Sequence, residues 1–287
     1  MSDRSDKITL GLRHLRTAAL LGLFLGILSL TSERAESAPV QVRFPEGLTH
    51  GFLLIRSDAG EIVGHGELTQ VVKEGGVAES RLLFRFNDGS VHDEKVAFSQ
   101  QRVFTMIRYQ LTQRGPSFPE QMDIVVDRGT SSYEVRSRSR EDGKEKVLTG
   151  DIDVPKDAYN GMIVTTLLNL PKGATETVNV LAFIPEPTPI ALELAFVGEQ
   201  VIRVGDHSRK AWQYAFKPEI GPLKKFVGTM LGKLPADFHY DCYILADDVP
   251  GFVRFEGPLQ LMGPVLSIEL VSPQMAVKAE DRKHDHR

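Results

Sequence analysis

The sequence of residues 51–68, GFLLIRSDAGEIVGHGEL, contains two runs of β-favouring residues on either side of a tight turn. The turn is Ser57-Asp58-Ala59-Gly60, in which the Asp side chain can bond to nearby backbone groups and Gly accepts a positive φ. The flanking runs, Gly51 to Arg56 and Glu61 to Leu68, are therefore predicted to be antiparallel neighbours in a β-hairpin.

The same arrangement recurs along the chain. Turn-forming segments lie at Lys73-Glu74-Gly75-Gly76, Asn87-Asp88-Gly89-Ser90 and Glu141-Asp142-Gly143-Lys144. Further strands are predicted at Val77 to Phe86, Val91 to Phe98, Val103 to Leu111, Gln121 to Asp127, Ser132 to Ser139, Lys146 to Gly150, Ile190 to Phe196, Trp212 to Phe216, Val253 to Glu256 and Ser267 to Leu270. Strands at intervals of about ten residues, without crossover helices between them, indicate an antiparallel meander.

Two of these segments have the two-residue period of a strand with one buried face. Ile190, Leu192, Leu194 and Phe196 alternate with small or charged residues, and the odd positions from Val103 to Leu111 form one β-favouring face. Both sets are predicted to face a core.

One segment, residues 157–170, has a helical period instead. Tyr159, Ile163, Leu167 and Leu170 follow one another at spacings of four, four and three residues, which places them on one helical face. Asp157 is predicted to cap this helix, and Pro171 to end it. A second, weaker helical or irregular stretch is predicted at 222–231.

These patterns predict a mainly β fold, a curved antiparallel meander or open half-barrel with one principal helix packed on it. Residues 38–275 are expected to form a single domain; if the domain divides, the boundary lies near 157–170. The tail, residues 276–287, is charged and has no apolar pattern, so it is predicted to be disordered.

The N-terminus has the order of a secretory signal peptide. A cationic start is followed by an apolar run from Thr17 to Leu30, and then by small residues that include Ser37 and Ala38. The run is shorter than the roughly 20 residues that a membrane-spanning helix needs. We therefore predict a signal peptide over 1–37, cleavage at Ser37 or Ala38, and export to the periplasm or cell envelope; the alternative is an uncleaved anchor.

Composition excludes several classes of protein. The 287 residues include 34 Lys plus Arg and 38 Asp plus Glu, a net charge of −4, without a basic block that would favour nucleic acid. Without residues 1–37, 29 basic and 34 acidic residues remain, a net charge of −5. The single Cys242 excludes an intramolecular disulfide and a multi-cysteine metal site, and it is predicted to be buried.

No established catalytic motif is present. The chain lacks the G-x-S-x-G and H-E-x-x-H patterns, so no catalytic residue, metal ligand or cofactor is assigned. His92 with Glu94, and His239 with Asp241, have the spacing that puts two side chains on one face of a strand. Both pairs suit an exposed strand surface, and together they leave an exported hydrolase as a minor alternative.

An aromatic stripe, Trp212, Tyr214 and Phe216, allows two interpretations. It fills a core beneath the sheet, or it contacts an apolar ligand in a cavity of a curved sheet.

The signal peptide, the GFLLIRS segment with its Asp-Ala-Gly turn, the single segment DVPKDAYNGMIVTTLLNLP and the closing FVRFEGPLQLMGPVLSIELVSP resemble exported bacterial proteins of unknown function. Over residues 48–273 the plan is similar to that of periplasmic lipoprotein-carrier (LolA-like) domains. The resemblance implies a curved sheet that holds helical cover over an apolar concavity. It carries over no site residue, and the present chain has less helical sequence than such a cover needs.

We therefore expect a non-enzymatic envelope protein that binds or carries an apolar ligand such as a lipid or acyl chain. The alternative is a structural module whose sheet edges or loops bind another envelope protein. Neither function involves nucleic acid or a stable transmembrane span after processing.

Overall fold

The computed structural model describes residues 39–204, 207–219, 240–260 and 263–272. The predicted signal peptide with its cleavage at Ser37 or Ala38, the predicted helical stretch 222–231, His239 and the predicted tail 276–287 lie outside the described residues.

Fourteen strands make up most of the described chain. Their bounds are Thr49–Ser57 (β1), Ile62–Lys73 (β2), Val77–Phe86 (β3), Val91–Gln100 (β4), Phe104–Arg114 (β5), Glu120–Asp127 (β6), Ser132–Ser139 (β7), Glu145–Asp151 (β8), Glu176–Phe183 (β9), Pro187–Val204 (β10), His207–Pro218 (β11), Tyr240–Leu245 (β12), Phe252–Gly257 (β13) and Leu266–Val271 (β14). A 3-10 turn, η1 (Glu74–Gly76), joins β2 to β3, and helix α2 (Ile163–Asn169) follows β8.

All fourteen strands form one antiparallel sheet. Its hydrogen-bonded order is β8-β7-β6-β5-β4-β3-β2-β1-β14-β13-β12-β11-β10-β9. The end strands β8 and β9 do not pair with each other, so the sheet is not closed. The predicted mainly β fold, with an antiparallel meander and one principal helix among the described residues, is confirmed.

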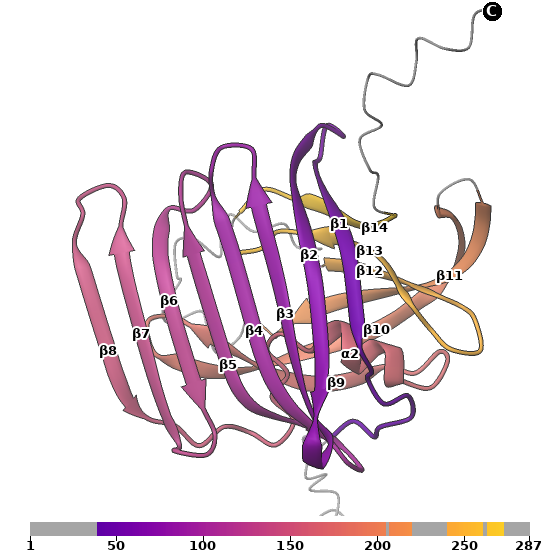
Figure 1. The fold of residues 1–287 in the computed structure, drawn as a ribbon, viewed down its shortest axis with the longest axis horizontal. Coiled ribbons are helices and arrows are strands. Elements are labelled where there is room, and N and C mark those ends of the chain that lie inside the picture. Colours follow the sequence, from indigo (N-terminus) through magenta and orange to yellow (C-terminus); the bar gives the residue numbers. More distant parts are fainter. Residues whose placement is uncertain (1–38, 205–206, 220–239, 261–262, 273–287) are drawn as a thin grey trace, which may run out of the picture. The chain divides into compact units, whose positions relative to one another are not determined.

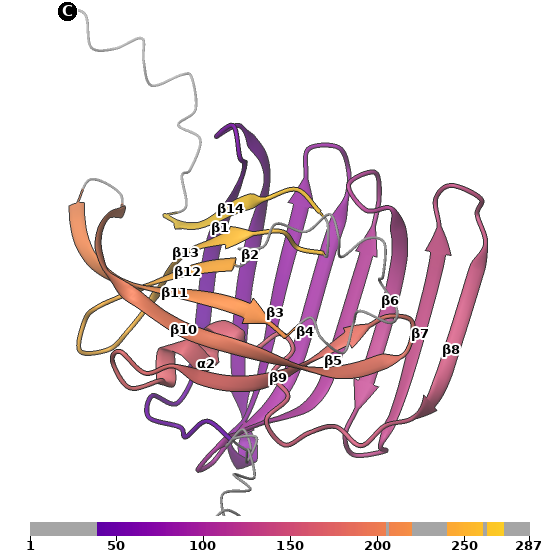
Figure 2. The same cartoon turned by 180° about the vertical axis from the view of Figure 1, so that it is seen from behind.

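The sheet turns back on itself where β1 pairs with β14. Strands β1–β8 form one layer, and β9–β14 cross behind it in a different direction (Figures 1 and 2). Strands from both sides of residues 157–170 belong to this one sheet. We call the face of β1–β8 that looks toward β9–β14 the inner face.

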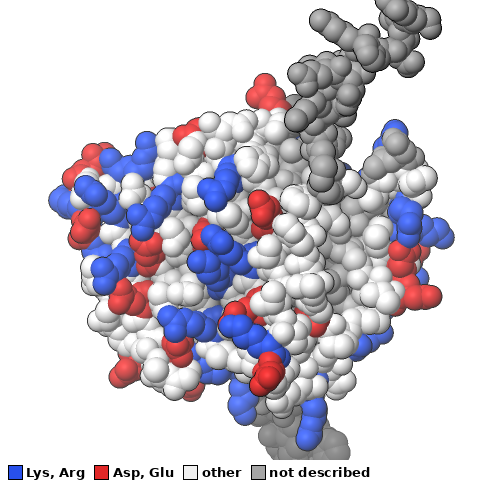
Figure 3. All heavy atoms as spheres, viewed as in Figure 1, with Lys and Arg blue, Asp and Glu red and all other residues white. Residues whose placement is uncertain are grey.

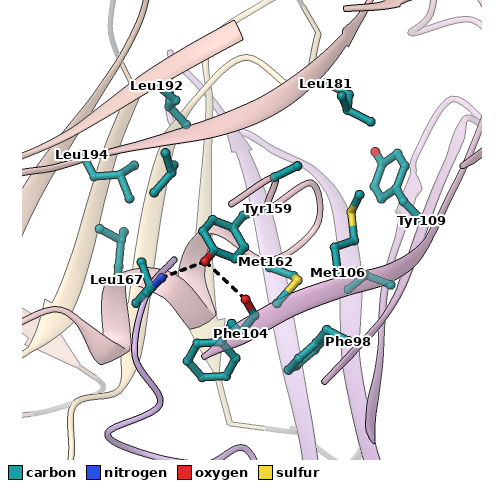
Figure 4. Close-up of a cluster of buried hydrophobic side chains, with 14 of the residues drawn as sticks. Phe98, Phe104, Met106, Tyr109, Tyr159, Met162, Leu167, Leu181, Leu192 and Leu194 are labelled. Carbon is teal, nitrogen blue, oxygen red and sulfur yellow. Dashed lines mark hydrogen bonds between the residues drawn. The ribbon is translucent and has the colours of Figure 1, made fainter. Parts of the chain in front are cut away.

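The main core lies between the two layers. It joins apolar side chains of the inner face to those of β9–β12 and α2, among them Phe98, Phe104, Met106, Ile124, Leu167, Leu192, Leu194 and Tyr214 (Figure 4). A smaller second cluster lies where the sheet turns back and contains Leu53, Ile55, Phe84, Leu266 and Ile268. Each fully buried side chain of this size stabilises the fold by roughly 1.5–3 kcal/mol.

Cys242 belongs to the main core, as predicted. The thiol is free and fully buried. Burial raises the pKa of this thiol, which therefore stays protonated and serves as a small apolar group.

The segment before β1 is fixed to the core by a buried tyrosine. The Tyr159 hydroxyl accepts a hydrogen bond from the Val40 N–H at 2.8 Å and donates one to the Phe104 carbonyl at 3.3 Å (Figure 4). Asn169 Oδ1 accepts bonds from the N–H groups of Arg43 and Phe44 at 2.8 and 2.7 Å. The first described residues are thereby held against residues more than a hundred positions away.

The helix is shorter than its sequence pattern predicts. It starts at Ile163, six residues after the predicted cap Asp157, and ends at Asn169 before Pro171 as predicted. Gly161 has a φ of 69°, which interrupts a right-handed helix. The prediction that Asp157 caps the helix is therefore wrong; this residue instead bonds the edge of β9.

The predicted odd-numbered face of residues 103–111 is also wrong in its first half. The inward residues are Phe104 and Met106, and then Tyr109 and Leu111. A β-bulge opposite Ala97 and Phe98 inserts one extra residue and switches the side chains between faces. By contrast, the predicted face with Ile190, Leu192 and Leu194 is buried, each residue being at most 7% exposed.

The two edge strands of the sheet, β9 and β8, differ in whether other residues cover their outer edges. The outer edge of β9 is covered by residues 157–160: the Asn179 N–H donates to the Asp157 carbonyl at 3.0 Å, and the Asn160 side chain bonds both the N–H and the carbonyl of Leu181. Among the described residues, β8 pairs only with β7. Its outer edge therefore has no backbone partner within the ranges that the structure describes.

No helix within the described ranges has both the length and the apolar character that crossing a bilayer requires.

Candidate functional site

A pocket lies at one end of the sheet, where the β1–β2, β3–β4 and β5–β6 turns meet the β13–β14 loop. Its volume is about 460 Å³, within the range of about 300–1,000 Å³ that is usual for small-molecule sites. It is lined by Ser57, Glu61, Ile62, Val63, Phe86, Asn87, Asp88, Ser117, Phe118, Leu259, Gln260, Pro264 and Leu266. We call it the end pocket.

The walls of the end pocket are apolar and belong to the second core cluster. Val63, Phe86 and Leu259 pack against that cluster, and Leu266 is one of its buried members. The rings of Phe86 and Phe118 meet edge to face with their centroids 6.0 Å apart. An apolar molecule in the pocket would thus contact side chains that the fold already holds in place.

The turns around the pocket are bonded to one another. Gly89 has a φ of 84°, which the β3–β4 turn requires. Asp88 accepts bonds from the Ser90 N–H and the Ser117 hydroxyl, both at 2.8 Å. The Asn87 side chain donates to the Ile62 carbonyl at 2.9 Å. These bonds join three separate turns, so the mouth of the pocket is formed before any ligand binds.

A buried imidazole lies behind the pocket. The His92 ring is 5.6 Å from the Phe84 ring and 6.4 Å from the Phe118 ring, between centroids, and only 5% of the residue is exposed. His92 Nδ1 and Gln113 Nε2 are 3.0 Å apart. Burial lowers the pKa of His92 to about 4, so the ring is neutral at pH 7.

The next polar pair on the inner face is Glu94 with Tyr109. The tyrosine hydroxyl donates to Glu94 Oε1 at 2.9 Å, and the Tyr109 ring stacks on Phe183 with centroids 6.1 Å apart. Burial raises the pKa of Glu94, and the bond from Tyr109 offsets this only in part. A carboxyl group is thereby kept in surroundings that disfavour its charge.

The predicted aromatic stripe faces the main core. Tyr214 and Phe216 are 0% and 5% exposed, and their rings contact those of Phe196 and Phe255 respectively. Trp212 is partly buried; its indole N–H donates to Glu199 at 3.3 Å. None of the three stripe residues lines the end pocket.

Of the predicted acid–base residues, the structure describes His92, Glu94 and Asp241, whereas His239 lies outside the described residues. His92 and Glu94 share the inner face of β4, as their spacing indicates. The prediction of an exposed strand surface for this pair is wrong, because the face packs against the core: His92 is only 5% exposed, and Glu94 accepts a bond from the buried Tyr109. Asp241 accepts a bond from Gln213 at 2.8 Å, and its neighbour Cys242 is the one that enters the main core, so Asp241 points to the opposite side of β12. In the part of the chain that the structure describes, no group of three or more His, Cys, Asp or Glu side chains could hold a metal ion.

The outer face of β1–β8 is strongly charged, with Lys, Arg, Asp and Glu side chains interspersed over it (Figure 3). A second hollow of about 330 Å³ on this face is lined in part by Arg81, Lys95 and Arg108. All three cations already have carboxylate partners, Asp93 for Arg81 and Lys95, and Asp127 for Arg108. We therefore regard the end pocket as the better candidate site.

Sequence reasoning found the turns at 57–60 and 87–90 but not the pocket they build. The pocket also needs Phe118 and the loop before Leu266, which are distant in sequence and have no shared motif. Only the β1–β14 pairing brings the last loop beside the first turn.

Comparison of the chain with models of protein families, with curated proteins and with solved structures finds no match.

Proposed function

We propose that the protein is a non-enzymatic binding protein of the cell envelope that takes an apolar small molecule, such as a lipid or acyl chain, into the end pocket. The observation that carries the proposal is the apolar lining of a 460 Å³ pocket whose rim is already bonded together. Sites of this kind, mostly apolar with a few polar groups at the edge, are typical of small-molecule binding.

The sequence supports the location. Residues 1–37 have the pattern of a secretory signal peptide, and the sequence over 48–273 resembles the plan of lipoprotein-carrier domains. The core beside α2 is filled, since Tyr159, Met162 and Leu167 are at most 1% exposed. We therefore place the ligand at the end pocket rather than at the helix or the aromatic stripe.

Titration of the full-length protein with the uncharged fluorescent probe N-phenylnaphthylamine tests the proposal. Ile62, 52% exposed at the rim, would be changed to Asp, and Leu259 to Trp to fill the pocket while keeping it apolar. The control is Val201→Asp, on the exposed outer part of β10. We expect saturable binding that both pocket variants weaken at least tenfold.

A tenfold loss is about 1.4 kcal/mol, which corresponds to about 55 Å² of apolar contact. The control should bind as the unsubstituted protein does. Probe binding that is absent, or that Val201→Asp weakens as much as Ile62→Asp does, would refute the proposal. Native mass spectrometry of protein purified from its own envelope adds an independent check, because a bound lipid should appear as a discrete mass increment.

A second candidate function rests on the uncovered edge of β8. An edge strand exposes unpaired backbone groups, and another extended strand can bond to them. Residues 157–160 cover the edge of β9, whereas no described residue pairs with the outer edge of β8, whose Val147 is 55% exposed. An envelope module that binds an extended segment of another protein would use this edge.

Charge favours a different protein over a second copy at this edge. If two β8 strands paired antiparallel about Leu148, Glu145 would face Asp151 at both ends, and like charges opposite each other destabilise a sheet. A photo-crosslinker at Val147 should give one discrete adduct with another protein in cells, and a crosslinker at Val201 should not. A crosslinked dimer of the chain itself, or equal adducts from both positions, would contradict this assignment.

A further inference from the structure

The rim of the end pocket carries negative charge only. Glu61 and Asp88 are the charged residues among the thirteen that line it, and Lys, Arg and His are absent from that described lining. Burial opposes ionisation of Asp88, but bonds from the Ser90 N–H and the Ser117 hydroxyl outweigh it and lower the pKa of Asp88. A ligand whose polar end is anionic would therefore meet two carboxylates and no lining cation.

Three of the neutral rim side chains each donate one hydrogen bond within the protein. The Asn87 amide donates to the Ile62 carbonyl, the Ser117 hydroxyl to Asp88, and the Gln260 amide to the Ser117 carbonyl at 3.5 Å. Among the lining side chains, the Ser57 hydroxyl and the second N–H of each of the Asn87 and Gln260 amides keep a hydrogen for which no acceptor is found among the described residues. What the rim offers to a ligand is chiefly acceptor oxygens, on the two carboxylates and the two amides.

Two arginines that adjoin the lining, Arg56 next to Ser57 and Arg140 bonded to Pro116, are engaged within the protein. Arg56 pairs with Glu269 at 3.4 Å and donates to the Gly60 carbonyl at 3.1 Å. Arg140 donates to the Pro116 carbonyl at 2.5 Å. Neither guanidinium lines the pocket, so a ligand in it would contact Glu61 and Asp88 but neither of these cations.

We infer that the end pocket selects amphiphiles whose polar end donates hydrogen bonds and carries no negative charge, an alcohol or a protonated amine, and disfavours fatty-acid carboxylates and phosphates. The inference rests on the proposed function and adds the chemical class of the ligand. The apolar wall sets how much chain is buried, and the rim decides which polar end can lie beside it. An amine gains attraction to Glu61 and Asp88, whereas a carboxylate meets repulsion.

Competition with a bound probe tests this. Decylamine, decanol and decanoate share one chain length, and each would displace N-phenylnaphthylamine from the full-length protein at pH 7. We expect the amine to compete at least tenfold better than the carboxylate, with the alcohol between them. Glu61→Gln should reduce the advantage of decylamine over decanoate, and Glu61→Lys should make decanoate a better competitor than decylamine. Asp88 is left unchanged because its bonds hold the rim together.

The control for Glu61→Lys is Glu186→Lys, which makes the same change in net charge at an exposed position outside the pocket. It should leave the order of the three competitors unaltered. Equal competition by all three compounds, or decanoate as the best competitor of the unsubstituted protein, would overturn the inference while leaving the pocket as a binding site. Failure of the probe itself to bind would instead refute the proposed function.

Discussion

The buried imidazole of His92 should make the protein lose stability on mild acidification. A free histidine has a pKa of about 6.5, whereas burial against Phe84 and Phe118 lowers that of His92 to about 4. Because the folded-state pKa is the lower one, the unfolded chain binds the proton more readily between these two values. Stability is therefore complete above about pH 6.5 and is lost as the pH falls toward 4.

The expected size follows from the two pKa values. One pKa unit corresponds to about 1.4 kcal/mol, so the whole contribution of His92 to the free energy of unfolding is about 3 kcal/mol. Of this contribution, about 2 kcal/mol is lost between pH 7 and pH 4.5. Glu94, two residues along the same strand, acts in the opposite direction, since its pKa is raised. The contribution of His92 must therefore be measured as the difference in pH-dependent stability between the unsubstituted protein and a variant that lacks this histidine.

The assay is urea unfolding of the full-length protein and of His92→Gln at pH 7 and pH 4.5. Gln keeps a partner for Gln113 but does not titrate. The unsubstituted protein should lose about 2 kcal/mol more between the two pH values than the variant does. The control, His65→Gln, changes an exposed residue of β2 and should preserve the full loss. Equal losses in His92→Gln and the unsubstituted protein would refute the assignment of a neutral buried ring.

Three further predictions concern the core and are read out by thermal or urea unfolding. Tyr159→Phe leaves the buried Val40 N–H without its acceptor and should cost about 1–3 kcal/mol, with faster hydrogen exchange in residues 39–44; an unchanged stability would contradict the bond seen in Figure 4. Glu94→Gln should stabilise the protein at pH 7 by at least about 0.5 kcal/mol, and the gain should disappear in acid, because the raised pKa means that the carboxyl is preferred in its protonated form. Gly66→Ala would place a Cβ 2.4 Å from the Phe84 ring and should cost about 1–3 kcal/mol, whereas Gly198→Ala meets no atom within 4 Å and should change little.

Local sequence patterns predicted the features that depend on local geometry. The two-residue period at 190–196 and the turns at 57–60 and 87–90 were correct because side-chain alternation and a positive φ at glycine are properties of a few adjacent residues. Periodicity also put His92 and Glu94 on one face.

The incorrect predictions have long-range causes. The predicted alternation at 103–107 was wrong because the pairing of β5 with β4 contains a bulge. The predicted start of the helix was wrong because residues 157–160 bond to the edge of β9 instead. The candidate site could not be predicted for the same reason. Its β13–β14 loop reaches the turns of the meander only through the pairing of β1 with β14, which are separated by more than two hundred residues.

This central pairing also determines the order in which the fold can be completed. The meander begins in the middle of the sheet and extends outward to β8, while β9–β14 return from the other end to the same point. In a chain that emerges N-terminus first, one side of β1 therefore stays unpaired until residues 266–271 are available. Such a late, non-local step is slow and leaves a reactive edge exposed. A chain that stopped before Leu266 would hold two incomplete sheets that lack the strand joining them.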